Sequence, residues 1–180
     1  ARPGQISGEE LALITGGTEG RFSPYAVYLD EGAPGDIAPV REGLASVQDE
    51  GSQLIALATT RVPVAAELPG RWLDLCAGPG GKTAFIASAA LSEQASVDAV
   101  EIAQHRAALI EQTVRELPVR VHVGDGRKLE EIKSLNIPEG GFTRVLIDAP
   151  CSGLGALRRR PEARWTKSPE DIPPLVTLQR

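Results

Sequence analysis

The sequence predicts an α/β fold with a doubly wound, mainly parallel sheet. Between residues 71 and 148, short apolar runs alternate with stretches whose apolar residues recur at helical spacing. Glycine or proline stands near most of the junctions, where a chain that alternates strands and helices has to turn. Right-handed crossovers join parallel strands, so the ligand crevice of such a sheet lies at the carboxyl ends of its strands.

The N-terminal residues are rich in Gly and Pro, which limits regular structure there. We expect a helix at Gly8–Ile14, ended by Gly16, and a strand at Tyr25–Leu29. A further helix is expected at Val47–Ala58, with Ser46 as its cap. The other expected strands are Arg71–Cys76, Ser96–Glu101, Val119–Val123 and Arg144–Asp148. The other expected helices are Gly81–Leu91, Ala103–Leu117 and a helix-like pattern in Pro169–Arg180.

A chain of 180 residues has the length of one domain with a sizeable core. We expect residues 1–45 to form an accessory or connecting region and residues 46–180 to form a ligand-binding domain. The sequence begins with Ala1 and contains no methionine. We therefore expect a fragment of a longer protein, with a sheet that is incomplete at its C-terminal side.

Composition restricts the function classes. The 19 basic and 24 acidic residues give a net charge of -5, which argues against a wholly basic nucleic-acid binder. Aromatic residues make up 4%, too few for a surface of stacked bases. Two cysteines and no run of about 18 apolar residues predict a cytoplasmic protein with reduced thiols and no membrane span. His105 and His122 have no metal-ligand spacing, so no metal is expected.

A glycine turn follows the first strand of the expected parallel sheet. It departs from both the phosphate-loop pattern and a clean G-x-G-x-x-G, which disfavours a nicotinamide enzyme. Glycines let the backbone approach a ligand closely, although a tight strand-to-helix turn would use them too. We expect the Cys76 side chain to be a buried, unreactive thiol, and the backbone of Cys76 to contact the ligand. The residues expected to cradle a ligand are Cys76, Ala77, Gly78, Pro79, Gly80, Gly81 and Lys82.

Two acidic residues follow the next two strands. Glu101 stands about 20 residues beyond the glycine turn, where a carboxylate would grip the ribose hydroxyls of a nucleoside cofactor. Asp125, in Gly-Asp-Gly, can accept a hydrogen bond from an adenine amino group. Considered separately, Glu101 would be interpreted as a solvated acid at the end of a strand, and Asp125 as a turn residue. Together with the glycine turn they predict a nucleoside-cofactor site.

The fourth strand ends in Asp148-Ala-Pro-Cys151. A cysteine fixed behind a proline at the ligand edge is suited to thiolate chemistry, with a buried structural thiol as the alternative. A basic cluster follows, which is either an RNA contact or a solvated face. Its members are Arg158, Arg159, Arg160, Arg164 and Lys167.

The chain resembles the Sun/Fmu-type RNA cytosine-5 methyltransferases, the bacterial small-subunit ribosomal RNA enzymes in particular, in four stretches: Val47–Leu54, Leu73–Thr83, Asp148–Gly153 and Leu157–Trp165. The resemblance covers about residues 40 to 170. It implies a Rossmann-like methyltransferase fold for residues 46–180, with S-adenosylmethionine cradled by Cys76 to Lys82. It places Glu101 at the ribose, Asp125 near the adenine, and Asp148 near the sulfonium and the target base.

The resemblance also implies a reaction, methyl transfer to C5 of cytosine in small-subunit ribosomal RNA. In this family a cysteine in a later Thr-Cys motif attacks C6, and the cysteine after Asp-Ala-Pro assists release of the product. Cys151 matches the second, so we expect Cys151 and Asp148 to be the catalytic residues present. The chain alone is then expected to bind the cofactor without transferring methyl groups. The alternatives are a non-catalytic cofactor- or RNA-binding module, and an enzyme like the DNA cytosine-5 methyltransferases with Cys151 as nucleophile.

Overall fold

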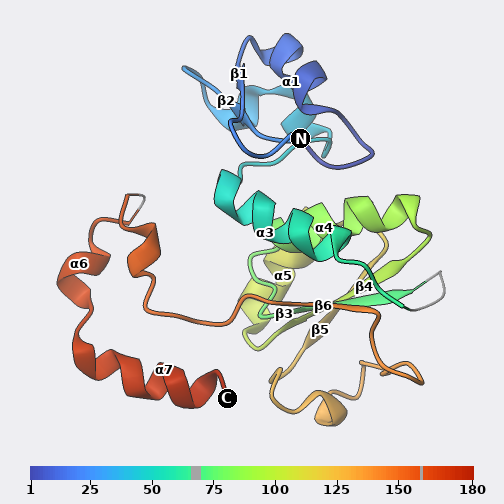
Figure 1. Cartoon of the computed structure of the whole chain (residues 1–180), viewed down its shortest axis with the longest axis vertical. Helices are drawn as coiled ribbons and strands as arrows, with labels where there is room; N and C mark the ends of the chain where they lie inside the picture. The colour runs from blue at the N-terminus through green and yellow to red at the C-terminus, as the bar shows by residue number, and fades with distance from the viewer. Residues whose placement is uncertain (66–69, 159) are drawn as a thin grey trace. The chain divides into compact units, whose positions relative to one another are not determined.

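The computed structural model describes residues 1–65, 70–158 and 160–180. They form two compact units, Ala1–Ile147 and Asp148–Arg180. A four-stranded parallel sheet organises the first unit (Figure 1). Its strands are β3 (Arg71–Leu75), β4 (Ser96–Glu101), β5 (Val119–Val123) and β6 (Arg144–Ile147), in the order β5-β4-β3-β6. The parallel pairing of all three neighbouring pairs confirms the predicted fold class.

The strand order locates the crevice of the sheet. From β3 the chain moves outward through β4 to β5, then returns to place β6 on the other side of β3. The order therefore reverses between β3 and β6. In open α/β sheets, ligands bind beyond the carboxyl ends of the strands at such a reversal. The turn that follows β3 stands at this point.

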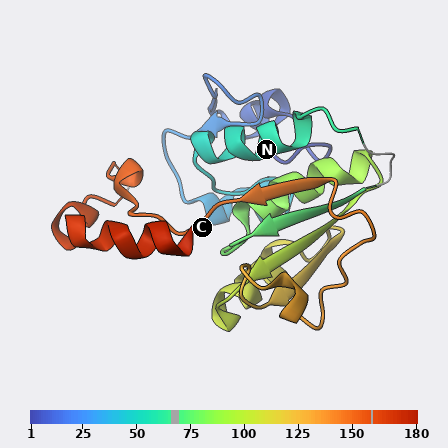
Figure 2. The ribbon, with the colours of Figure 1, turned by 60° about the horizontal axis from the view of Figure 1, so that its bottom comes forward.

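Helices cover one face of the sheet, as Figure 2 shows for α3 (Glu50–Arg61) and α4 (Gly81–Ser92). Leu57 of α3 and Phe85 and Ile86 of α4 pack with Trp72, Val97 and Leu146, which are all buried on the sheet. Farther along the same face, Ile110 of α5 (Gln104–Thr113) packs with Ala99. These helices are apolar on the side that meets the strands, so burial of that side stabilises the layer.

The connection from β5 to β6 covers part of the opposite face. It contains the short helix η2 (Leu129–Glu131). Ile132 and Leu135 pack on Leu73 and Val100 of the sheet. In place of a long crossover helix, this connection is mostly a loop, and its apolar side chains hold it against the sheet.

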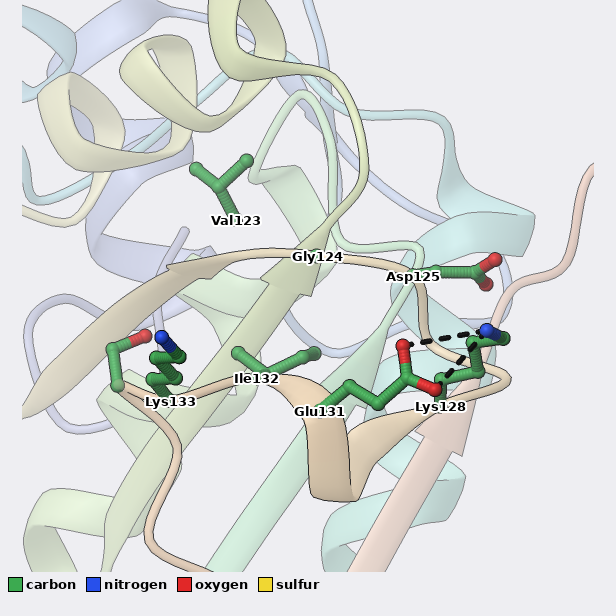
Figure 3. Close-up of a pocket in the computed structure, with 8 residues that line it drawn as sticks. Val123, Gly124, Asp125, Lys128, Glu131, Ile132 and Lys133 are labelled. Carbon is green, nitrogen blue, oxygen red and sulfur yellow. Dashed lines mark hydrogen bonds and ion pairs between the residues drawn. The ribbon is translucent and has the colours of Figure 1, made fainter.

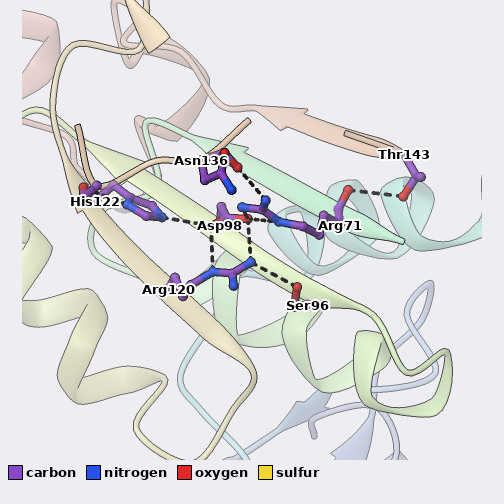
Figure 4. Close-up of polar contacts among 8 residues, drawn as sticks. Arg71, Ser96, Asp98, Arg120, His122, Asn136 and Thr143 are labelled. Carbon is purple, nitrogen blue, oxygen red and sulfur yellow. Dashed lines mark hydrogen bonds and ion pairs between the residues drawn. The ribbon is translucent and has the colours of Figure 1, made fainter. Parts of the chain in front are cut away.

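A buried carboxylate lies at the centre of this opposite face (Figure 4). Asp98 has no exposed surface and accepts hydrogen bonds from Arg71 (Nη2 at 2.6 Å), Arg120 (Nε at 3.1 Å) and the His122 ring (Nε2 at 2.9 Å). Burial by itself would raise the pKa of Asp98, but the hydrogen bonds from Arg120, His122 and Arg71 outweigh it and lower the pKa below 3.8. Asp98 is therefore ionised and links three strands through its partners on β3 and β5.

The N-terminal residues pack against the start of α3. They form α1 (Gly8–Thr15), the antiparallel pair β1 (Thr18–Glu19) and β2 (Val27–Tyr28), the short helix η1 (Pro34–Asp36) and α2 (Ala38–Arg41). Glu50, the first residue of α3, accepts hydrogen bonds from the backbone N–H groups of Phe22 and Ser23 and from the Tyr28 hydroxyl. One carboxylate thus ties this region to α3. The boundary expected between residues 45 and 46 stays a prediction.

The second unit contains η3 (Leu154–Ala156), α6 (Ala163–Thr166), η4 (Pro169–Asp171) and α7 (Ile172–Leu178). Inside it, the Gln179 side chain donates a hydrogen bond to the carbonyl of Pro150. The helix-like pattern expected near the end of the chain is present as η4 and α7.

Several boundaries differ from the expected ones. The helix expected from Val47, capped by Ser46, begins at Glu50, because the Asp49 carboxylate accepts from the Gly51 N–H and caps it. The strand expected at Tyr25–Leu29 is reduced to two residues. The helix expected to reach Leu117 ends at Thr113. Cys76 and Asp148 lie just outside β3 and β6.

None of the described helices is long and apolar enough to cross a membrane. In the ranges that the structure describes, no three His, Cys, Asp or Glu side chains are grouped as a metal ion would require.

Replacement of Asp98 by Asn should destabilise the fold, because it leaves the two arginines without their buried counter-ion. We expect the free energy of unfolding to fall by about 3 kcal/mol at pH 7 in urea titrations. The lowered pKa means that Asp98 stabilises the protein above pH 3.8 and loses this effect as the pH falls through the folded-state value. The difference between wild type and Asp98→Asn should therefore shrink in acid. Equal stabilities at pH 7, with Asp30→Asn as the exposed control, would contradict this role.

Candidate functional site

The turn after β3 depends on residues that adopt unusual backbone conformations and leave room beside the backbone. Cys76 has a φ of 59° and Gly80 a φ of 106°, which turn the chain from the strand into α4. A Cβ on Gly78 would lie 2.4 Å from Oε2 of Glu101, so a side chain has no room there. Because Gly78 has no side chain, the Glu101 carboxylate and the Arg106 side chain can approach the backbone of the turn closely.

A buried hydrogen bond between side chains on β3 and α4 holds the two ends of this turn together. Thr83, in the first turn of α4, donates a hydrogen bond to Oδ2 of Asp74 over 2.6 Å, and both side chains are fully buried. This bond joins β3 directly to α4, so the ends of the turn are held at a fixed separation.

Glu101 reaches the glycine turn from the end of β4. Its Oε2 accepts a hydrogen bond from the Gly78 N–H over 3.0 Å, and its Oε1 accepts one from the Ala103 N–H over 3.0 Å. The residue is 2% exposed. Two of the three features predicted to bind a nucleoside are therefore brought into direct contact.

Arg106, on α5, is a member of this cluster that the sequence reasoning missed. Its Nη1 lies 3.5 Å from Oε2 of Glu101, and its guanidinium also donates a hydrogen bond to the carbonyl of Gly78. A basic residue on an amphipathic helix ordinarily faces solvent, and its spacing from Glu101 carries no motif. The fold alone places it beside the turn.

Asp125 follows β5, whose end is joined to β4 by a hydrogen bond from the Gly124 N–H to the Glu101 carbonyl. Its carboxylate accepts hydrogen bonds from the Arg127 guanidinium, from Nε to Oδ1 over 2.9 Å and from Nη2 to Oδ2 over 2.5 Å. Hydrogen bonds from the side chain and the backbone of Arg127 lower the pKa of Asp125 to about 2. Asp125 is therefore an ionised acceptor just beyond the end of β5, the strand next to β4.

A hollow of about 440 Å³ lies beside the end of β5 (Figure 3). Asp125 is the one predicted site residue among those that line it, and neither the glycine turn nor Glu101 borders it. An ion pair between Lys128 and Glu131 stands on one side. This charged hollow adjoins the predicted site at Asp125 only.

The remaining predicted residues belong to the second unit. Asp148, its first residue, follows β6 directly in the chain, and Cys151 is exposed. The two cysteines are not joined by a disulfide. Of the basic cluster, Arg159 lies outside the described residues. The exposed members are Arg158, Arg160, Arg164 and Lys167.

Comparison with known proteins agrees with the fold and the motifs. The crystal structure of PH0851 superposes with a TM-score of 0.82 at 24% identity, over 97% of this chain and 39% of that one. A Mycobacterium tuberculosis protein named as a methyltransferase is 56% identical over the whole chain, which covers 38% of that protein. Ribosomal RNA small subunit methyltransferase B of Cronobacter sakazakii is 39% identical over 170 residues, which are 92% of this chain and 37% of that protein.

The chain thus spans less than two fifths of the length of these relatives. The model of the family described as 16S rRNA methyltransferase RsmB/F matches residues 63–180. This match covers more than half of the chain, and it includes the glycine turn, Glu101, Asp125 and Cys151. The chain belongs to the RsmB/F family of 16S rRNA methyltransferases.

Proposed function

We propose that this chain binds S-adenosylmethionine at the carboxyl edge of its sheet and serves methyl transfer to C5 of cytosine in small-subunit ribosomal RNA. The family and its structural relatives are S-adenosylmethionine-dependent methyltransferases. The observation that carries the proposal for this chain is the contact between Glu101 and the glycine turn. It places an acidic side chain against the glycine turn at the carboxyl edge of the sheet.

The residues at this edge fit a nucleoside cofactor. A carboxylate has about four acceptor positions, and the backbone N–H groups of Gly78 and Ala103 fill two of them at Glu101, while Arg106 forms an ion pair at 3.5 Å. The Arg106 side chain is 41% exposed, and it is the contact that ribose hydroxyls would replace at Glu101. Asp125, on the neighbouring strand, would accept from the adenine amino group. Peptide groups of the turn would face the rest of the cofactor.

The reaction needs a thiolate, because C5 of cytosine is a poor nucleophile until addition at C6 turns the ring into an enamine. When bound, the cofactor supplies an electrophilic methyl group on its sulfonium. Asp148 would lie near the target base, and Cys151 would assist release of the methylated RNA. The sequence contains no Thr-Cys pair, which is the position of the attacking cysteine in the family.

RNA would be held by the basic cluster of the second unit. Residues 148–180 carry six basic and four acidic residues, whereas the chain as a whole is acidic. Exposed arginines contribute to RNA affinity mainly through the phosphates, and this contribution depends on salt. We propose that the protein acts in the cytoplasm, where its RNA substrate is found.

Calorimetric titration with S-adenosylhomocysteine should show binding by the folded chain. Glu101→Gln should weaken it by about 1 to 3 kcal/mol, because the amide loses the charge-assisted bonds to ribose. Glu116→Gln, an exposed change, should leave the affinity unaltered. No heat at millimolar ligand from folded wild type would refute cofactor binding, and an unaltered Glu101→Gln would remove Glu101 from the site.

Replacement of both Arg160 and Arg164 by Ala should flatten the dependence of RNA affinity on salt. Each lost phosphate contact on a single strand removes about 0.7 from the slope of log affinity against log salt, so the slope should fall by roughly 1.4. The measurement is filter binding of a 16S RNA segment over a salt series. A matched double replacement of Arg61 and Arg115, exposed in the first unit, should change little. An unaltered slope would make the basic cluster a solvated face.

The chain should not transfer methyl groups to RNA although it holds the cofactor, since Cys151 matches the release position. Incubation with labelled S-adenosylmethionine and unmethylated small-subunit RNA measures this directly. Label at cytosine C5 that disappears in Cys151→Ser would instead make Cys151 the nucleophile, as in the DNA cytosine-5 methyltransferases.

A further inference from the structure

A glutamine immediately before the cap of α3 has a buried amide nitrogen without a partner. Nε2 of Gln48 is inaccessible to solvent, and none of the described residues accepts a hydrogen bond from it. A buried donor left unsatisfied costs about 1 to 3 kcal/mol, so native structures rarely keep one without a reason. A ligand that supplies an acceptor would remove this cost.

The Gln48 amide lies against the glycine turn. Nε2 is 3.7 Å, and Cδ 4.0 Å, from the point that a Cβ on Gly81 would occupy, and no other described atom outside the local backbone lies within 4 Å of that point. Gly81 is the first residue of α4. The Gln48 amide therefore lies within van der Waals distance of the place that a side chain on Gly81 would occupy, at the start of α4.

The position of Gln48 in the fold differs from that of the residues proposed to bind the ribose and the adenine. The ribose and adenine contacts come from Glu101 and Asp125, at the ends of β4 and β5. Gln48 instead leads into α3, which packs on α4 and on β6, the strand at the other side of β3. The part of the ligand that meets Gln48 is therefore the part farthest from adenine.

We propose that Gln48 binds the amino-acid end of S-adenosylmethionine, with Nε2 donating a hydrogen bond to its carboxylate. The inference rests on the proposed function and adds a residue to its site. An amide N–H needs an acceptor, and the carboxylate is the acceptor that distinguishes this end of the cofactor. The N–H groups in the first turn of α4 favour a negative charge at the same place.

A pair of ligands separates this role from a general effect on the site. S-adenosylhomocysteine carries the carboxylate, whereas 5′-methylthioadenosine keeps the nucleoside and the sulfur without the amino acid. Gln48→Leu should weaken S-adenosylhomocysteine about tenfold, the value of a hydrogen bond to a charged group, and leave 5′-methylthioadenosine unchanged. Gln48→Glu should weaken S-adenosylhomocysteine at least as much, through repulsion between carboxylates. Gln112→Leu, an exposed change on α5, is the matched control and should affect neither ligand.

The outcomes distinguish the two proposals. Equal weakening of both ligands by Gln48→Leu, or no weakening of either, would overturn the role of Gln48 while cofactor binding stands. Failure of wild type to bind either ligand would overturn both proposals. If Gln48→Leu does not fold, Gln48→Asn, which keeps an amide but shortens its reach, should show the same selective loss for S-adenosylhomocysteine.

Discussion

The hydrogen bond from the Gly78 N–H to the Glu101 carboxylate is the contact on which the site depends. It forms because β3 and β4 are parallel neighbours, so the residues that follow them meet at one edge. The strand order puts this edge beside a reversal point of the sheet, and the Thr83 bond to Asp74 fixes the turn behind it. The turn thus keeps its position relative to the ends of both strands.

The two faces of the sheet are stabilised by different kinds of interaction. The face that the helices cover contains most of the apolar core, including Trp72 and Phe85. The packing of Phe85 on this face holds α4 in position against the sheet. The opposite face contains Asp98 and its cationic partners, which join β3, β4 and β5 by charge as well as by backbone pairing. A buried carboxylate persists there because it is fully hydrogen-bonded. These restraints keep the strand ends in register, and the cofactor proposal depends on that register.

Periodicity and glycine placement in the sequence were enough to predict the four strands, their parallel pairing and the edge at which Glu101 and Asp125 stand. The cap of α3 was misplaced, because Ser46 and Asp49 are both good caps and the choice depends on the packing of residues 22–28 against Glu50. Arg106 was missed since its role arises from the partners that the fold brings to it, the Glu101 carboxylate and the Gly78 carbonyl. Arg127 was missed although its partner Asp125 is only two residues away, because that spacing carries no motif. Gln48 was inside a recognised motif, but its buried amide is visible only in three dimensions.

The most direct test of this account is a crystal structure of the chain with S-adenosylhomocysteine bound. The account predicts ribose hydroxyls within hydrogen-bond distance of Glu101, adenine beside Asp125 and Arg106 displaced from the Glu101 carboxylate. A ligand bound away from the ends of β4 and β5, with Glu101 still enclosed by Gly78 and Arg106, would contradict it.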